Sequence, residues 1–168
     1  MMRTELTAAM KDYFGPRPDL VEHTLQVTAF AEQLLGRIKA KDEGVNADVV
    51  VAAALMHDIG IPEAERQHGS AAGHYQEQEG PPIARRLMES LQLDPDLITE
   101  VCEIVAHHHS PGVVQTPNFA ILYDADWLVN LPNQYERMGM NRVPEAAIAK
   151  RYLTDAGRSL AKELFLKP

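Results

Sequence analysis

Eight consecutive apolar residues, from Val49 to Met56, lead directly into His57 and Asp58. As a helix this run has no polar face, so we expect it at the centre of a domain, surrounded by other helices. Asn46 stands where the N-cap of such a helix is expected. A carboxylate beside an imidazole is costly to bury unless it is paired or coordinated. The sequence therefore predicts a central helix that ends in two metal ligands.

The sequence predicts an all-α fold, because helical periodicity dominates the chain and the alternation typical of β-strands is nearly absent. Apolar residues recur at spacings of three and four from Asp19 to about Lys39, in a long amphipathic helix that carries His23 near its start. Asp94-Pro95 begins a helix that runs into the three histidines at 107–109. Further helices are expected at 2–14, at 81–91, after an N-cap at Asn118, and at 144–166. We therefore expect about six or seven helices in one compact domain.

The stretch from Gly60 to Gly80 interrupts the helical pattern, because it contains Pro62, Gly69 and little apolar content. An irregular segment of this length inside a compact domain is more often functional than neutral. We expect this segment to form a lid over the predicted metal ligands. Pro81-Pro82 then suits the first turn of the next helix, where a missing N–H costs nothing.

Length and charge limit the function classes that fit the chain. Its 168 residues suffice for one domain with a core of its own. The 16 Lys and Arg residues against 24 Asp and Glu give a net charge of −8, so we expect no duplex nucleic acid as a partner. The single cysteine, Cys102, allows no internal disulfide, and no segment reaches the roughly 20 apolar residues of a membrane span. We therefore expect a cytoplasmic protein without a membrane partner.

Residue types that ligate metals occur in four sets on four separate predicted helices. These sets are His23, His57-Asp58, His107 to His109, and Asp124 with Asp126. Helices packed around a common core can direct such side chains to one point, as metal sites in helical bundles do. Imidazole and carboxylate ligands without thiolates suit Mn, Fe, Co, Ni or Zn. We therefore expect a divalent transition metal as cofactor, with one or two ions per chain.

Each of these sets also has a plainer interpretation when it is taken alone. A lone histidine in an amphipathic helix, such as His23, is more often a partly buried structural residue than a ligand. The pair at 57–58 could equally cap a helix or form an ion pair. The histidines at 107–109 could form a cationic last turn that interacts favourably with the helix dipole. The order and combination of the sets favour a bound metal over these separate explanations.

Three motifs follow one another in a fixed order. They are a histidine on an early helix, the run Ala-Ala-Ala-Leu-Met-His57-Asp58-Ile-Gly, and a later Ala-Asp126-x-Leu. This pattern, which spans roughly Val21 to Leu131, resembles the HD-domain superfamily of metal-dependent phosphohydrolases. The resemblance implies a single HD-type helical domain with a metal site in its helix core. The motif-bearing core would cover about 18–138, with the helices at 2–14 and 144–166 packed on it.

The resemblance also implies which residues bind the metal. The core ligands that it assigns are His23, His57, Asp58 and Asp126. Asp58 bridges two metals in members that hold two, and His107 and His108 match the additional histidines that hold the second metal. Asp124 would either contact a ligand or replace one. His109 would contact the ligands without binding the metal.

One position departs from the pattern of the superfamily. Members with a full second site usually supply a histidine at the position where this chain has Gln76. His74 is close but out of register, and Glu77 and Glu79 are the nearby carboxylates. The sequence therefore leaves open whether the chain holds one metal or two.

The activity implied by the resemblance is metal-dependent hydrolysis of a small phosphomonoester or a nucleotide. A divalent cation lowers the pKa of bound water and withdraws charge from the phosphoryl oxygens. The residues expected to serve catalysis are Asp58, His107 and Glu79. The residues expected to bind the phosphorylated substrate are Arg66, His74, Gln76, Glu77 and Arg85.

Two other functions stay open. An HD-type di-iron oxygenase acting on a small polar substrate would need His74, Glu77 or Glu79 to complete the second site. A non-catalytic sensor would bind a metal and a nucleotide without turnover. The oligomeric state is open as well, since an exposed apolar helix face would imply a homodimer.

Overall fold

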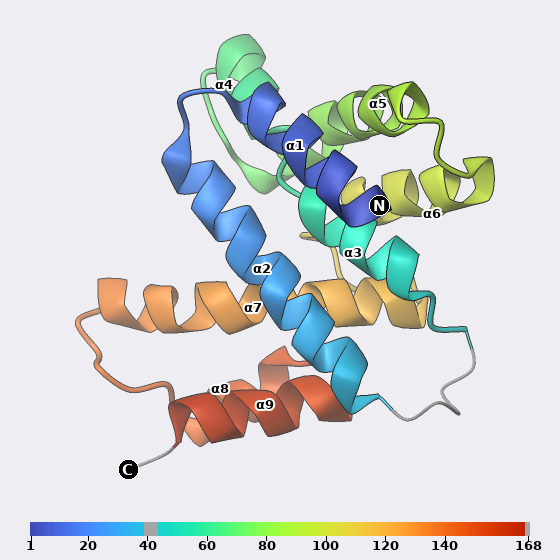
Figure 1. Ribbon diagram of the computed structural model, residues 1–168. Coiled ribbons are helices and arrows are strands. Elements are labelled where there is room, and N and C mark those ends of the chain that lie inside the picture. The colour runs from blue at the N-terminus through green and yellow to red at the C-terminus, as the bar shows by residue number, and fades with distance from the viewer. Residues whose placement is uncertain (39–43, 167–168) are drawn as a thin grey trace.

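The computed structural model describes residues 1–38 and 44–166, and within that part of the chain all regular structure is helical (Figure 1). The helices are α1 (Met2–Phe14), α2 (Pro18–Arg37), α3 (Ala47–Met56), α4 (Ile61–His68), α5 (Gly73–Ser90), α6 (Pro95–Val105), α7 (Pro117–Arg137), α8 (Glu145–Arg151) and α9 (Asp155–Phe165). This confirms the all-α class. The described residues form nine helices, however, where the sequence predicts six or seven. Lys39, the predicted end of the second helix, lies outside the described residues.

The central helix is α3, as its composition predicts. Every residue from Val49 to Met56 is buried, and the helix packs against α1, α2, α6 and α7. Asn46 caps it, because the Asn46 side chain accepts hydrogen bonds from the backbone N–H groups of Asp48 and Val49 at 3.0 and 3.3 Å. In Figure 1, α2 crosses in front of α7, and α5 and α6 lie side by side, with α6 packed against α3. The residue that follows α3 is therefore surrounded by packed helices.

The predicted cap of α7 is wrong by two residues. Thr116 is the N-cap, and its hydroxyl accepts from the N–H of Phe119 at 3.2 Å. Asn118 instead joins α7 to α3 and α6, because its side chain accepts from the N–H of Asn46 at 2.8 Å and donates to Glu100 at 2.7 Å. The polar side chain that local sequence assigns to a cap is used here for a tertiary contact.

The predicted irregular lid is also wrong. Residues 61–68 form α4, α5 begins at Gly73, and Pro81 and Pro82 lie inside α5 rather than in its first turn. The helical periodicity of apolar residues is hard to detect here, because α4 buries only Ile61 and Ala64. The first half of α5 likewise packs with Gln76 and Gly80, neither of which is an apolar side chain.

The single helix predicted at 144–166 is two helices. Tyr152 ends α8 in an extended conformation, and Thr154 caps α9 by accepting from the N–H of Gly157 at 2.8 Å. Asp124 of α7 stabilises this break, since it accepts the N–H groups of Leu153 and Thr154. Among the described residues, none of the helices combines the length and apolar character that a membrane span requires.

Candidate metal centre

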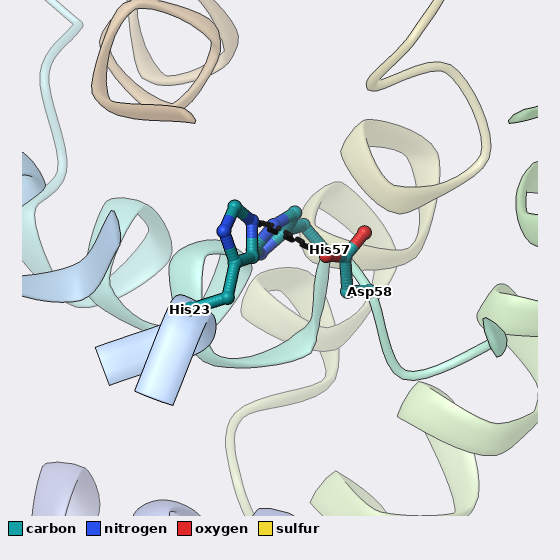
Figure 2. Close-up of side chains that lie close together, drawn as sticks. All are labelled: His23, His57 and Asp58. Carbon is teal, nitrogen blue, oxygen red and sulfur yellow. Dashed lines mark hydrogen bonds and ion pairs between the residues drawn. The ribbon is translucent and has the colours of Figure 1, made fainter. Parts of the chain in front are cut away.

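Four predicted core ligands converge at the end of α3. His23 comes from α2, Asp126 from α7, and His57 and Asp58 from the turn after α3. The Nε2 atom of His23 lies 3.3 Å from Asp58 Oδ2 and 3.2 Å from Asp126 Oδ1. The Nε2 atom of His57 lies 3.3 and 3.6 Å from the same two oxygens and 3.4 Å from His23 Nε2. Figure 2 shows the two imidazoles and Asp58 turned toward one another.

These separations fit a single metal ion. Ligand atoms about 2.0–2.2 Å from one ion, in tetrahedral or octahedral arrangement, lie about 2.8–3.6 Å from one another. Five of the six separations between the four ligand atoms run from 3.2 to 3.6 Å. The two facing Nε2 atoms of His23 and His57 form no hydrogen bond with each other when both carry lone pairs. A cation between them would accept both lone pairs.

Backbone carbonyls set the tautomers of two histidines. His57 Nδ1 donates to the carbonyl of Ala54 at 2.8 Å, and His108 Nδ1 donates to the carbonyl of Val105 at 2.8 Å. Because these nitrogens carry the protons, each neutral ring presents its Nε2 lone pair to the cluster. Orienting a ligand histidine through its second nitrogen is the usual arrangement in metal sites.

Mutual attraction holds the cluster charged even though it is buried. Burial alone would lower the pKa of His57, but the carboxylates of Asp58 and Asp126 raise it well above its ordinary value. Burial alone would raise the pKa of Asp126, but hydrogen bonds from His23 and His57 hold it well below its usual range. Two carboxylates in one buried site need nearby positive charge, which either protonated imidazoles or a metal cation can supply.

A second group of ligand types adjoins the first through Asp58. His108 and His109 lie with Asp58 in a cluster that could hold a metal ion. His108 Nε2 is buried, has no hydrogen-bond partner among the residues that the structure describes and lies 3.6 Å from Asp58 Oδ1. The two oxygens of Asp58 therefore face two different groups of histidines.

The histidine pair in this second group differs from the sequence prediction. The sequence predicts His107 and His108 as ligands, but the structure brings His108 and His109 to Asp58. The helix α6 ends at Val105, and the turns that follow leave His107 half-buried outside this group. The pKa of His109 is lowered to about 4, because the His109 ring is partly desolvated and because His108 lies close to it. His109 is therefore neutral at pH 7, and one of its two ring nitrogens carries a lone pair.

Gln76 is buried beside this second group. Its side-chain N–H donates to the carbonyl of Ala71 at 2.7 Å, and its side-chain oxygen lies 3.1 Å from His109 Nε2. Glu77 accepts from the N–H of His109 at 3.0 Å and from the hydroxyl of Ser110 at 3.1 Å. The two predicted substrate-binding residues thus hold the turn that carries His109.

Four other predicted site residues have partners of their own. Glu79 accepts from His68 at 2.9 Å, Arg66 pairs with Glu63 at 2.6 Å, Arg85 pairs with Glu89 at 3.8 Å, and the His74 ring packs on Tyr75. No hydrogen bond or ion pair between described residues joins any of the four to the metal ligands. Their catalytic and substrate-binding roles stay predictions.

Asp124 faces away from the cluster, so its predicted place beside the ligands is wrong. It is fully buried and accepts from the N–H of Leu153 at 2.7 Å and from the N–H and hydroxyl of Thr154 at 2.8 and 2.6 Å. Two residues apart on a helix are about 200° apart in direction, so Asp124 and Asp126 cannot both face one point. Asp124 instead joins α7 to the start of α9.

We expect Asp124→Ala to lower the free energy of unfolding by about 2 kcal/mol or more, because it leaves buried donors unpaired. The Mn²⁺ affinity of the folded protein should stay unchanged. Urea unfolding and a Mn²⁺ titration measure the two effects. Asp155→Ala, which removes an exposed carboxylate from the same helix start, should change the unfolding free energy by less than about 0.5 kcal/mol. A loss of Mn²⁺ affinity in folded Asp124→Ala would contradict this assignment.

Sequence reasoning missed Asn130, whose side chain donates to Asp126 Oδ1 at 2.7 Å. The signal was present, because residues four apart on a helix lie on the same face. Asn130 therefore belongs to the surroundings of the cluster.

Comparison with known proteins agrees with the arrangement of this site. The model of the family described as HD domain matches residues 20–131. The chain belongs to the HD domain family. The matched range contains all four converging ligands, from His23 to Asp126, and the His57-Asp58 pair at the end of α3.

Two known proteins are similar to this chain, one in structure and one in sequence. A crystal structure of a predicted HD superfamily hydrolase from an uncultured Thermotogales bacterium matches with a TM-score of 0.67 and 22% identity, covering 95% of this chain and 83% of that one. That likeness shows the fold. Ribonuclease Y from Petrotoga mobilis (strain DSM 10674 / SJ95) is 28% identical over 113 residues, which is 66% of this chain but 18% of Ribonuclease Y. The chain therefore matches a small part of that relative.

Proposed function

We propose that this HD domain is a metal-dependent phosphohydrolase that acts on a small phosphomonoester or a nucleotide. The observation that carries the proposal is the convergence of His23, His57, Asp58 and Asp126, whose two imidazole nitrogens lie 3.2 to 3.6 Å from the two carboxylate oxygens and from each other. A divalent ion bound there lowers the pKa of a bound water and withdraws charge from phosphoryl oxygens. Imidazole and carboxylate ligands suit Mn, Fe, Co, Ni or Zn.

The exposure of the ligands indicates where a substrate would reach the site. The His57 side chain is 1% exposed and those of Asp58 and Asp126 are each 9% exposed, whereas that of His23 is 21% exposed. Solvent therefore reaches the cluster beside His23. A substrate phosphate would approach from that side, while the buried ligands hold the ion from behind.

The curated relative supports hydrolysis of a phosphate ester. The name Ribonuclease Y describes an enzyme that acts on RNA, whose backbone is a phosphodiester. This chain carries a net charge of −8, which favours a small substrate over a long polyanion. We therefore propose a small phosphate ester, bound through the metal, as the partner.

Metal analysis followed by an activity screen tests the proposal. The protein is purified without chelator or affinity-tag histidines, and its bound transition metals are counted per chain. Phosphate release is then measured on phosphomonoesters and nucleotides with each of Mn, Fe, Co, Ni and Zn. One ion per chain and metal-dependent release are expected. A protein that binds none of these ions after soaking would exclude the proposal.

The second metal-ligand group favours one alternative, a di-iron oxygenase. Asp58, His108 and His109 could hold a second ion. Gln76 opposes this, because its amide N–H is engaged by Ala71 and its oxygen accepts from His109 Nε2. While that bond stands, His109 Nε2 carries the proton and only His109 Nδ1 has a lone pair, and Gln76 adds no further imidazole to the group. We therefore favour one bound ion in the native chain.

We expect Gln76→His to raise the number of bound Mn²⁺ or Fe²⁺ ions from about one to about two per chain, since it replaces a hydrogen-bond acceptor by a ligand. Isothermal titration calorimetry and elemental analysis measure the number. Gln78→His, at an exposed position of the same helix, should leave it at one. Two ions already present in the native chain would instead favour the oxygenase.

A further inference from the structure

Asn130 acts on the ligand oxygen of Asp126 that faces the histidines. Its side-chain N–H donates to Asp126 Oδ1 at 2.7 Å. The same oxygen lies 3.2 Å from His23 Nε2 and 3.6 Å from His57 Nε2. Asn130 thus contacts the atom that Asp126 would offer to a metal ion, and not the second carboxylate oxygen.

The chemistry of the amide suits a support for a metal ligand. A carboxylate side chain turns about two bonds, and a hydrogen bond to one oxygen restricts that rotation. The donor from Asn130 is neutral, so it holds Oδ1 without placing a positive charge where a cation would bind. A Lys or Arg at 130 would compete with the metal, whereas an amide does not.

We propose that Asn130 is a positioning residue that holds Asp126 ready for the metal and thereby sets the metal affinity. The inference rests on the metal centre of the proposed function and needs no substrate. Residues that hydrogen-bond to metal ligands commonly change metal affinity 10–100-fold when they are replaced. A contact between residues four apart on a helix surface contributes only about 0.2–0.5 kcal/mol to helix stability. The role should therefore be visible in metal binding and not in the stability of the metal-free protein.

The test compares Asn130→Leu with Asn133→Leu. Leucine has the same branching and the same number of side-chain heavy atoms as asparagine but no donor, and Asn133 is an exposed asparagine of the same helix. Calorimetry with Mn²⁺ should show a dissociation constant about 10–100-fold higher for Asn130→Leu and unchanged for Asn133→Leu. The visible absorption of the Co²⁺-loaded protein should change for Asn130→Leu alone. Thermal unfolding of the metal-free proteins should be the same for both variants and the native chain.

Asn130→Asp separates positioning from direct coordination. It keeps the shape of the side chain but replaces the donor by a second carboxylate beside Asp126, so weaker Mn²⁺ binding is expected. Tighter binding would mean that the charge near the ion, and not the hydrogen bond to Asp126, sets the affinity, which overturns the proposal. Equal Mn²⁺ affinity and equal Co²⁺ spectra for the native chain and Asn130→Leu would overturn it as well, while leaving the proposed function intact. If the native chain bound neither Mn²⁺ nor Co²⁺, both the role of Asn130 and the proposed function would be wrong.

Discussion

Asp58→Asn is expected to reduce metal-stimulated phosphate release by about 1,000-fold or more. One Asp58 oxygen lies 3.3 Å from the Nε2 atoms of both His23 and His57, and the other lies 3.6 Å from His108 Nε2. Asparagine keeps the size of the side chain but removes the charge that both histidine groups share. The buried imidazoles then lose the anion that balances a bound cation.

Asp48→Asn provides the matched control for this change. Asp48 lies in the first turn of the same helix, α3, and is exposed. Phosphate release with Mn²⁺ and far-ultraviolet circular dichroism are measured on both variants. Helicity should be retained in both, and release should be lost only in Asp58→Asn. Release near the native rate in Asp58→Asn would rule out the proposed function at this site.

The parts of the fold that the sequence predicts depend on local rules. The position of α3 follows from a run without a polar face, which only a fully surrounded helix can bury. Asn46 caps α3 as predicted, and Asp94 caps α6 where the sequence predicts that a helix begins, because a cap depends on the side chain and the next two or three N–H groups. The convergence of His23, His57 and Asp126 was expected from the family resemblance, and the structure brings these residues together.

The parts that the sequence does not predict depend on contacts between distant segments. Asp124 could be assigned to α9 only once that helix was known to start beside α7. The choice of His108 and His109 over His107 depends on the turns after α6, where helical periodicity no longer applies. Gln76 looked like a missing ligand, yet its hydrogen bonds to Ala71 and His109 are visible only in three dimensions.

Gly60→Ala is expected to lower the free energy of unfolding by about 3 kcal/mol or more, a large effect for one methyl group. Gly60 has φ −77° and ψ −15°, which alanine adopts readily. The requirement for glycine is therefore one of space. A Cβ atom at position 60 would lie 2.6 Å from the carbonyl oxygen of Gln76 and 2.7 Å from the N atom of Gly80. Both are backbone atoms of α5, so no side-chain rotation relieves the overlap.

Gly36→Ala is the control for this substitution, and its effect should have the opposite sign. Gly36 lies in α2 with nothing within 4 Å of an added Cβ, so alanine should stabilise the chain by about 0.5–1 kcal/mol. Urea unfolding without metal measures both variants. Because Gly60 lies two residues after Asp58, a folded Gly60→Ala protein should also bind Mn²⁺ more weakly. A Gly60→Ala protein as stable as the native chain would show that α5 is not packed backbone to backbone against the turn that carries the metal ligands.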